Sequence, residues 1–315
     1  MRASFLLPLS SLLASASFAC TSPASPASPG SEEDAAERAA ESSGGSLVGG
    51  RPAAADELPA TLVISNNCTA AKVGPRHVLT AAHCIVYPDG AGTVVPTFVP
   101  GQTIGLSTNR TVDNVTPLAP GFVAVQLAAV EVHPSYTREI PNGMNLGPNP
   151  AADVAILVLT EASAAKIRTV PVAPISSRPV VAGEPLVIAG YGCEIGVAVP
   201  SDYTHATLKL QETRALAPSD ALIAGLAPAP HPSADLPGNY FFTPGALLEP
   251  NAASLCPGDS GGPVYRRDGS VVGVNAYYNF HPQDIVGVSV SNWHTRLDDQ
   301  ALDGVGAWVR RTLAL

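Results

Sequence analysis

The residues best suited to chemistry in this sequence are a histidine, an aspartate and a serine, each inside a distinctive short segment. His83 lies in Leu-Thr-Ala-Ala-His-Cys, Asp153 opens an apolar run, and Ser260 lies in the glycine-rich stretch Gly-Asp-Ser-Gly-Gly-Pro. A serine hydroxyl is a weak nucleophile until a nearby base takes its proton, and imidazole suits that task near neutral pH. A carboxylate can then orient the imidazole and stabilise its charged form. Each residue alone is typical of a structural role, so the interpretation depends on the combination.

Three motifs in the chain resemble those of the chymotrypsin-like (trypsin-like) serine peptidases. Thr-Ala-Ala-His-Cys, which contains His83, matches the histidine motif of that family. Asp-Val-Ala-Ile-Leu-Val-Leu, which begins at Asp153, resembles its aspartate motif, and the segment around Ser260 is identical to its serine motif. The order His, Asp, Ser along the chain agrees with this family and differs from that of the subtilisins and the α/β-hydrolases. The resemblance extends from Leu47 to about Arg310.

This resemblance implies a role for each residue and a fold. His83 is expected to act as general base and then as general acid, Asp153 to orient it, and Ser260 to attack the scissile carbonyl, with the N–H groups of Gly258 and Ser260 as the oxyanion hole. The implied fold is all-β: two six-stranded antiparallel β-barrels with the active site between them and a C-terminal helix. Polypeptides are the expected substrates of a monomer, and neither a cofactor nor a metal is expected.

The segment Leu-Val-Gly-Gly that begins at Leu47 resembles the Ile-Val-Gly-Gly that follows the activating cut in this family. The resemblance implies a zymogen that is cleaved between Ser46 and Leu47, after which the new α-amino group pairs with Asp259. The nearest upstream basic residue is Arg38, so we expect an activating peptidase that is not trypsin-like. The alternative is that the segment only begins a strand.

Substrate preference is predicted from two positions that the resemblance places at the primary pocket. Ser254 falls at its base and offers no counter-charge, and Tyr278 stands in place of a glycine of its wall. We therefore expect a neutral, small or apolar P1 residue, because a buried cation would lack a partner. Ala276 stands where the family has a serine that supports the triad aspartate. The alternative function is a catalytically inactive serine-peptidase-like binding domain, but the chain keeps all three triad residues.

The chain contains five cysteines, so one must remain without a partner if the others pair. By the family resemblance, Cys68 and Cys84 form the disulfide that staples the histidine loop. Cys193 and Cys256 then remain and are predicted to pair, with two buried thiols as the alternative. Cys20 directly follows the N-terminal apolar segment, in a context that resembles a bacterial lipoprotein cleavage site. Either it carries a lipid, or ordinary signal cleavage leaves it free or removes it.

The composition of the N-terminal residues resembles that of an export signal followed by a linker. Residues 1–19 resemble a signal peptide, with a buried N-terminal helix as the alternative, and residues 20–46 are a low-complexity tether or propeptide. Residues 47–315 are predicted to be the peptidase domain, with barrels at about 47–170 and 171–315. We expect an exported protein, secreted or lipid-anchored at the bacterial cell envelope, whose only membrane contact would be that lipid.

Composition and local patterns favour a β architecture and argue against nucleic-acid binding. Of the 315 residues, 46% are hydrophobic, and Gly (28) and Pro (31) are frequent, which favours a turn-rich β fold with a sizeable core. The net charge is −9 and no basic cluster occurs, so nucleic acid is not an expected partner. The Pro/Gly-rich stretch 87–121 is expected to be a surface loop, and 298–315 a helix with Leu302 on its apolar face. The predicted strands are Thr61–Ser65, His77–Ala81, Val123–Val132, Val154–Leu159, Leu186–Ala189, Thr207–Thr213, Pro263–Tyr265, Val271–Ala276 and Ile285–Val290.

Overall fold

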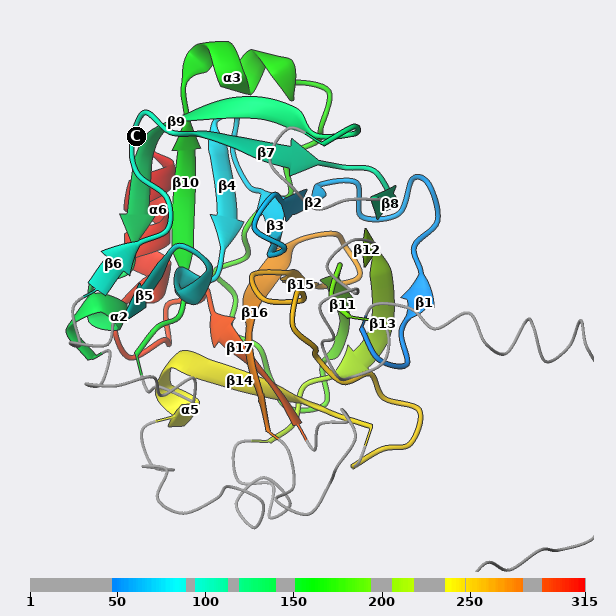
Figure 1. Ribbon diagram of the computed structural model, residues 1–315. Helices are drawn as coiled ribbons and strands as arrows, with labels where there is room; N and C mark the ends of the chain where they lie inside the picture. Colours follow the sequence, from blue (N-terminus) through cyan, green and yellow to red (C-terminus); the bar gives the residue numbers. More distant parts are fainter. Residues whose placement is uncertain are drawn as a thin grey trace, which may run out of the picture. The chain divides into compact units, whose positions relative to one another are not determined.

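The computed structural model describes most of the chain after the N-terminal segment. The described residues are 47–88, 94–112, 119–139, 151–193, 206–217, 236–246, 248–279 and 291–314. The predicted signal peptide, the 20–46 segment with Cys20, and the strand predicted at Ile285–Val290 lie outside them. In the described part, two antiparallel sheets carry most of the chain (Figure 1).

The first sheet is a closed six-stranded barrel in the order β10-β4-β3-β2-β7-β9. Its strands follow short runs of β-branched and other apolar residues, and every residue of β2, β3, β4 and β10 is buried. β9 instead alternates between more and less exposed positions, as expected for a strand with one face toward solvent. The bounds are β2 Thr61–Ile64, β3 Thr69–Lys72, β4 His77–Thr80, β7 Thr103–Ser107, β9 Val123–Val132 and β10 Ala155–Leu159.

The second sheet contains seven strands in the order β1-β13-β11-β15-β16-β17-β14. The sheet curls toward a barrel where the N–H of Leu216, just after β13, donates to the carbonyl of Phe242 in the edge strand β14 (2.8 Å). The edge strand β1 comes from the N-terminal segment and pairs with β13. The bounds are β1 Arg51–Pro52, β11 Pro185–Gly190, β13 Lys209–Arg214, β14 Tyr240–Pro244, β15 Pro263–Tyr265, β16 Val271–Asn279 and β17 Ser291–Arg296.

Short helices and two small two-stranded sheets complete the described part. In Figure 1 α3 lies over β9, and the Ser163 Oγ of α3 accepts a hydrogen bond from the Gln126 N–H of β9 (2.7 Å). The helices are η1 Ala82–Cys84, α2 Pro134–Glu139, α3 Glu161–Lys166, α5 Leu236–Asn239 and α6 Val305–Leu313, and the small sheets pair β5 Val86–Pro88 with β6 Val94–Pro96 and β8 Thr111–Val112 with β12 Ala206–Thr207. No helix among the described residues is long and apolar enough to span a membrane.

The C-terminal helix is shorter than the sequence pattern predicted. It begins at Val305 because Gly304 adopts a left-handed conformation (φ 68°), which ends the preceding turn. Leu302, expected on the buried face, precedes the helix and is 68% exposed. The helix returns to the first barrel, where the Trp308 ring packs edge-on against His133, with ring centroids 5.1 Å apart.

The stretch 87–121 is not simply a surface loop, because β7 within it is a strand of the closed barrel. Ile104 and Leu106 are buried on its core face, and Gly105 between them leaves room for the Phe122 side chain. A Cβ at Gly105 would lie 2.9 Å from the Phe122 ring, so the position requires glycine. The strand was not predicted from the sequence because β7 carries only two large apolar residues and Pro and Gly residues surround it.

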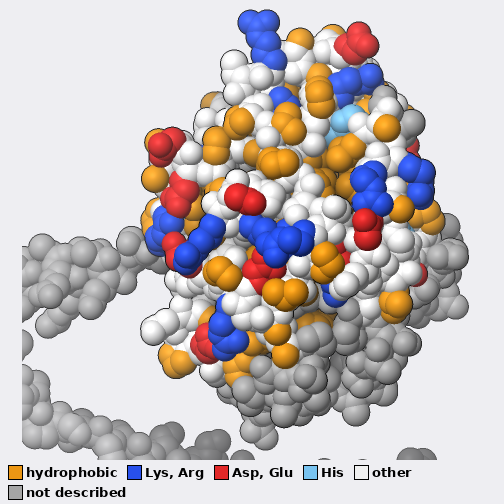
Figure 2. Space-filling view, turned by 180° about the vertical axis from the view of Figure 1, so that it is seen from behind, with side chains coloured by type: hydrophobic (Ala, Val, Ile, Leu, Met, Phe, Trp, Pro, Cys, Tyr) orange, Lys and Arg blue, Asp and Glu red, His pale blue; other side chains and the backbone are white. Residues whose placement is uncertain are grey.

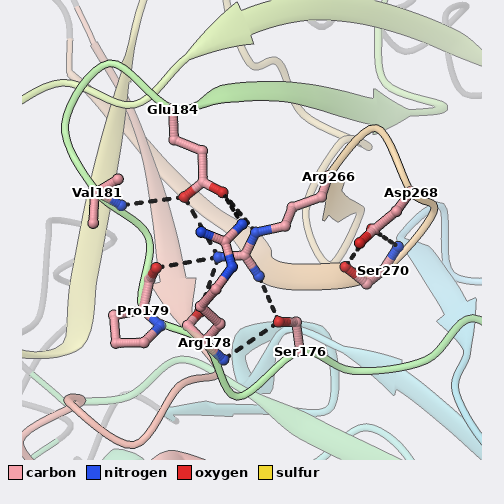
Figure 3. A network of polar contacts seen from close by, with 8 residues as sticks. All are labelled: Ser176, Arg178, Pro179, Val181, Glu184, Arg266, Asp268 and Ser270. Carbon is pink, nitrogen blue, oxygen red and sulfur yellow. Dashed lines mark hydrogen bonds and ion pairs between the residues drawn. The ribbon is translucent and has the colours of Figure 1, made fainter.

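The connection between the two barrels is held by a buried ion pair (Figure 3). The Arg266 guanidinium, just after β15, donates to the Glu184 carboxylate (2.7 Å), to Ser176 Oγ (2.5 Å) and to the Arg178 carbonyl (2.9 Å). Arg266 and Glu184 are 5% and 8% exposed, so their charges are nearly withdrawn from water and must be paired. The pair fixes the inter-barrel segment against the β15–β16 hairpin.

Charged side chains of both signs mix on the face turned away from the view of Figure 1. Figure 2 shows lysine and arginine side chains interspersed with acidic ones on this face. Arg267–Glu212 and Arg310–Asp299 are examples of exposed pairs of this kind. Such pairs contribute little to stability individually.

Candidate active site

His83 and Asp153 meet because they lie at the same end of two neighbouring strands. β4 and β10 are antiparallel partners, with Thr80 opposite Ala155. His83 follows β4 in the short helix η1, and Asp153 precedes β10, so the register brings both to one edge of the first barrel. The His83 Nδ1 lies 2.6 Å from Asp153 Oδ2, and the His83 backbone N–H donates to Oδ1 (2.9 Å). The carboxylate therefore fixes both the ring and the backbone of the histidine.

The environment of this pair favours a charged histidine in spite of burial. The Asp153 side chain is 0% exposed and the His83 side chain 25% exposed. Burial lowers the pKa of His83, but the charge of Asp153 and the hydrogen bond to it together raise the pKa above its ordinary value. Asp153 receives further support at its backbone, where Thr295 Oγ1 of β17 donates to its carbonyl (2.9 Å). That contact joins the second sheet to the first.

Ser260 reaches the same place from the second sheet. Its carbonyl accepts a hydrogen bond from the Thr69 N–H of β3 (2.8 Å). The same carbonyl lies 3.7 Å from the Cys84 Sγ, and Cys84 directly follows His83. The structure therefore brings Ser260, which is partly exposed, beside the segment that carries His83.

The turn around Ser260 depends on glycines that approach other backbone closely. Gly258 has φ 103° and Gly261 has φ 81°, a region that favours glycine. A Cβ at Gly258 would lie 2.7 Å from the Gly192 Cα. Within the described part of the chain, the N–H groups of Gly258 and Ser260 donate to no acceptor. An oxyanion site requires backbone N–H groups of this kind, which have no other acceptor and lie beside the serine hydroxyl.

Thr69 in the first barrel holds the other side of this turn. Its Oγ1 donates to the Gly258 carbonyl (2.7 Å) and accepts from the Tyr191 N–H (2.9 Å). Thr69 is 0% exposed, so both bonds are shielded from water. One hydroxyl thus connects β3 to two segments of the second half of the chain.

Both predicted disulfides are present, and each ties a loop of the site. Cys68 pairs with Cys84, which links the start of β3 to the segment that carries His83. Cys193 pairs with Cys256, which links the segment after β11 to the turn that carries Ser260. The Cys193 N–H also donates to the Pro257 carbonyl (2.9 Å).

Asp259 is a fully buried carboxylate under the Gly-Tyr-Gly segment 190–192. Its oxygens accept from the N–H groups of Gly192 (2.8 Å) and Cys256 (2.9 Å). A Cβ at Gly190 would lie 2.0 Å from Asp259 Oδ1, so this segment must be glycine-rich to cover the carboxylate. Burial raises the pKa of Asp259 to about 7, although its two backbone hydrogen bonds oppose that shift. Among the described residues, no cation forms an ion pair with Asp259.

Leu47 is docked in the second half of the chain although it precedes the first barrel. Its side chain is 0% exposed and packs with Ile188, Ala253 and Leu255. Val48 and Ser254 exchange two backbone hydrogen bonds (3.1 and 2.9 Å). The Leu47 segment therefore lies beside the loop that leads to Asp259. This position agrees with a docked N-terminus and equally with the simple start of a strand.

Three tyrosines surround the His83–Asp153 pair. The Tyr277 ring stacks on His83, with centroids 5.8 Å apart and planes at 28°. The phenols of Tyr136 and Tyr277 hydrogen-bond to each other, and Tyr240 donates to the Ala151 carbonyl (2.6 Å). Burial first, and the charge of Asp153 second, raise the pKa of all three phenols, so they stay neutral. Tyr136 lies in the segment His-Pro-Ser-Tyr ahead of the aspartate motif and Tyr277 in the expected pocket strand, whereas no sequence pattern indicated Tyr240.

Ala276 occupies an irregular position of β16 beside these tyrosines. The pairing register with β17 shifts between Asn275 and Tyr277, so Ala276 is the extra residue of a β-bulge. It offers no hydroxyl to Asp153, as expected from the sequence. The bulge turns the ring of Tyr277 toward His83.

The two residues expected at the primary pocket lie together near Leu47. Ser254 is 0% exposed, and its Oγ accepts from the Ala246 N–H (3.1 Å). Tyr278 is partly buried and packs against the cluster around Leu47. Two described cavities, of about 520 and 480 Å³, are lined by other residues and contain none of the three motif residues. Across the described ranges, no three His, Cys, Asp or Glu side chains gather as metal ligands would.

Comparison with known protein families identifies a family for most of the chain. The family model described as Trypsin matches residues 47–291, which include the first sheet, all three motifs and the second sheet up to the start of β17. No curated protein matches the chain.

Proposed function

The chain belongs to the trypsin family and is therefore a serine-type endopeptidase, and we propose that His83, Asp153 and Ser260 carry its reaction. The observation that supports this most directly is the pair of hydrogen bonds from His83 to Asp153, at 2.6 and 2.9 Å. They leave Nδ1 protonated, so Nε2 is the nitrogen that can accept a proton.

The proposed reaction proceeds in two halves. His83 Nε2 takes the Ser260 proton as Oγ attacks the peptide carbonyl, and the Gly258 and Ser260 N–H groups stabilise the oxyanion. The His83 imidazolium, stabilised by Asp153, then gives its proton to the leaving amine and an acyl-enzyme remains. Water, deprotonated by His83, attacks the acyl carbon and releases Ser260 in the reverse manner.

We further propose that the chain is a zymogen that is cleaved between Ser46 and Leu47. The buried Leu47 side chain and its neighbouring backbone hydrogen bonds support a docked segment at this point. Asp259 is buried without a cationic partner in the described part of the chain, and a new ammonium group at Leu47 would supply one. The activating peptidase would not be trypsin-like, because the nearest upstream basic residue is Arg38.

The proposed P1 preference is for neutral, small or apolar residues. Ser254 offers no charge, and its hydroxyl is already bonded to the Ala246 N–H. Tyr278 places a large ring where the resemblance implies a glycine. A cation at P1 would therefore meet no counter-charge.

Export of the chain is a further proposal, supported by the two disulfides, which persist in oxidising compartments. Residues 1–19 would be a signal peptide, and Cys20 would either carry a lipid or be left free by ordinary cleavage. Mass spectrometry of the purified N-terminal peptide distinguishes these two products, since a diacylglycerol group changes its mass.

The proposed function is tested on the exported chain by sequencing the mature N-terminus and labelling with a serine-directed fluorophosphonate. We expect a chain that starts at Leu47 and is labelled, loss of labelling in Ser260→Ala, and unchanged labelling in Ser270→Ala, a matched control whose hydroxyl bonds Asp268. A chain that starts at Leu47 without labelling would instead favour a catalytically inactive binding domain.

A further inference from the structure

A buried polar chain crosses the second sheet and ends on the peptide bond before Ser260. Asn275, in β16, exchanges backbone hydrogen bonds with Gly261 (2.8 Å) and Gly262 (2.7 Å). Its side-chain Nδ2 donates to the carbonyls of Asp259 (3.2 Å) and Ala189 (3.0 Å). Because carbonyl oxygens only accept hydrogen bonds, the amide must present its NH₂ to them and its Oδ1 to the other side.

The residue on that other side is His294 of β17. The His294 Nδ1 lies 3.0 Å from Asn275 Oδ1, and its Nε2 lies 2.9 Å from Thr243 Oγ1 in β14. Since Asn275 Oδ1 accepts only, Nδ1 must carry the ring proton, and Nε2 must accept from the Thr243 hydroxyl. Burial lowers the pKa of His294 to about 3, so the ring stays neutral at working pH and keeps one donor and one acceptor.

The far end of the chain lies on the segment where Leu47 is docked. Asn292 Nδ2 faces three acceptors, the Ala253 carbonyl (2.8 Å), the Pro244 carbonyl (3.1 Å) and Thr243 Oγ1 (3.3 Å), and its Oδ1 accepts from the Leu255 N–H (2.9 Å). Asn275, His294, Thr243 and Asn292 are all 0% exposed. The three hydrogen bonds that link Thr243, His294 and Asn275 to the Asp259 carbonyl therefore all run in one direction, toward that carbonyl.

The direction matters because of the geometry of a trans peptide. The Asp259 carbonyl and the Ser260 N–H belong to the same planar unit and point in opposite directions. Two donors, Asn275 Nδ2 and the Gly262 N–H (2.9 Å), hold that carbonyl on the sheet side. The Ser260 N–H is thereby turned away from the sheet. Gly262 permits this arrangement, because a Cβ there would lie 2.2 Å from the Ala189 carbonyl.

We propose that Asn275, His294 and Thr243 are positioning residues that hold the Asp259–Ser260 peptide so that the Ser260 N–H points at the substrate oxyanion. The inference rests on the proposed function of Ser260 and adds to it a support for one oxyanion donor. Removing the Thr243 hydroxyl leaves the buried His294 Nε2 without its donor, while Nδ1–H still faces Asn275 Oδ1. The ring is then held on one side only, and the Asn275 amide that holds the peptide is fixed less firmly.

The kinetic test uses three variants of the exported, processed chain on a chromogenic peptide amide. Thr243→Val keeps the shape and removes the hydroxyl, Thr243→Ser restores a hydroxyl, and Thr61→Val is the control. Thr61 is equally buried and its Oγ1 bonds Tyr265 OH (3.0 Å), so the control loses a comparable bond outside the chain. A missing oxyanion donor costs about 10²–10³ in kcat, and a misdirected one is expected to cost about tenfold, with KM little changed.

A second measurement does not depend on activity. In the Ser260→Ala background with ¹⁵N-labelled histidine, NMR reports which ring nitrogen of His294 carries the proton, with His294→Gln as the assignment control. We expect the Nδ1–H form throughout the range from pH 5 to pH 8, with a shifted Nε2 signal in Thr243→Val because that nitrogen loses its donor. The backbone amide signal of residue 260 should shift in Thr243→Val and return toward its position in Thr243→Ser.

The outcomes separate the two proposals. Loss of kcat and a shifted residue-260 amide in Thr243→Val, both restored by Thr243→Ser and absent in Thr61→Val, support the positioning role. An Nε2–H tautomer of His294, or an unmoved residue-260 amide in Thr243→Val, overturns it. If even the unaltered chain neither hydrolyses nor labels, the proposed function fails, and the two NMR readouts still decide the positioning role.

Discussion

For individual residues, the His83–Asp153 contact should be visible in the pH dependence of hydrolysis. Only neutral His83 can accept the Ser260 proton, so kcat/KM should fall as the pH drops below the raised pKa of His83. Asp153→Asn removes the charge that raises this pKa and no longer selects the Nδ1–H tautomer. We expect kcat to fall by about 10⁴ and the His83 pKa, followed by NMR titration, to move down. An unchanged His83 titration would show that Asp153 does not control it.

Asp259 should make the uncleaved chain less stable as the pH rises. Its pKa is raised from 3.8 to about 7 in the folded protein, so between these values the folded state binds more protons than the unfolded state. The free energy of unfolding should then fall with rising pH, by at most about 1.4 kcal/mol per pH unit. Denaturant unfolding of uncleaved Ser260→Ala between pH 4 and 8 measures this slope.

Asp259→Asn is the control for that slope, because it keeps the shape and cannot titrate. The slope between pH 4 and 7 should become flatter in this variant. If cleavage before Leu47 pairs its ammonium group with Asp259, the pKa of Asp259 should fall and the contribution should reverse sign. A slope that is identical in all three proteins would mean that Asp259 is not the titrating group.

Among the elements, the segment between the barrels should depend strongly on Arg266 for its stability, because this arginine is buried. Among the residues that the structure describes, Arg266→Met leaves Glu184, which is 8% exposed, with the exposed Arg178 as its one charged partner. Breaking a buried pair costs about 3–5 kcal/mol, and the remaining Arg178 contact places the expected loss at about 3 kcal/mol. Denaturant unfolding measures the loss.

The neighbouring arginine offers a matched control. Arg267 is 72% exposed and pairs with Glu212, which is 67% exposed, so Arg267→Met should change the free energy of unfolding by less than about 0.5 kcal/mol. Equal losses in the two variants would argue that position in the β15–β16 hairpin, and not burial of the pair, determines the cost.

In the whole molecule, the two barrels are joined at the site by a few hydrogen bonds. Thr69→Val removes the hydroxyl that connects β3 to the Gly258 carbonyl and the Tyr191 N–H. Thr61→Val removes another inter-barrel bond, to Tyr265, away from the Ser260 turn. We expect similar losses of stability, about 1–2 kcal/mol each, but a lower kcat only in Thr69→Val. Equal kcat values in the two variants would contradict a role of Thr69 in holding the turn.

The sequence predicted the architecture well because its motifs and strand patterns are local. The runs at Val123–Val132 and Pro263–Tyr265 are strands with the predicted bounds, and both disulfides pair as expected. β3 and β14 were missed because Thr69–Lys72 carries two alanines, and Tyr240–Pro244 ends in proline. Their burial comes from partners elsewhere in the chain, which a local pattern does not contain.

The same reason limited the prediction of the site. His83, Asp153 and Ser260 lie in recognisable segments, whereas Tyr277, Asn275 and His294 acquire their contacts from residues far away in the sequence. A β-bulge at Ala276 shifts the pairing register between Asn275 and Tyr277, and the sequence alone gives no sign of it. The sequence shows the residue types, but it does not show how distant strands pair, and that pairing places these side chains in the site.

The division of the site between two sheets has a consequence for a chain that emerges N-terminus first. The first barrel, with His83 and Asp153, ends well before the last fifth of the sequence, in which Ser260 and the strand β17 lie. Under the proposed mechanism, a nascent chain thus holds the base without its nucleophile. The proposed activity can begin only after the C-terminal part of the chain has been synthesised.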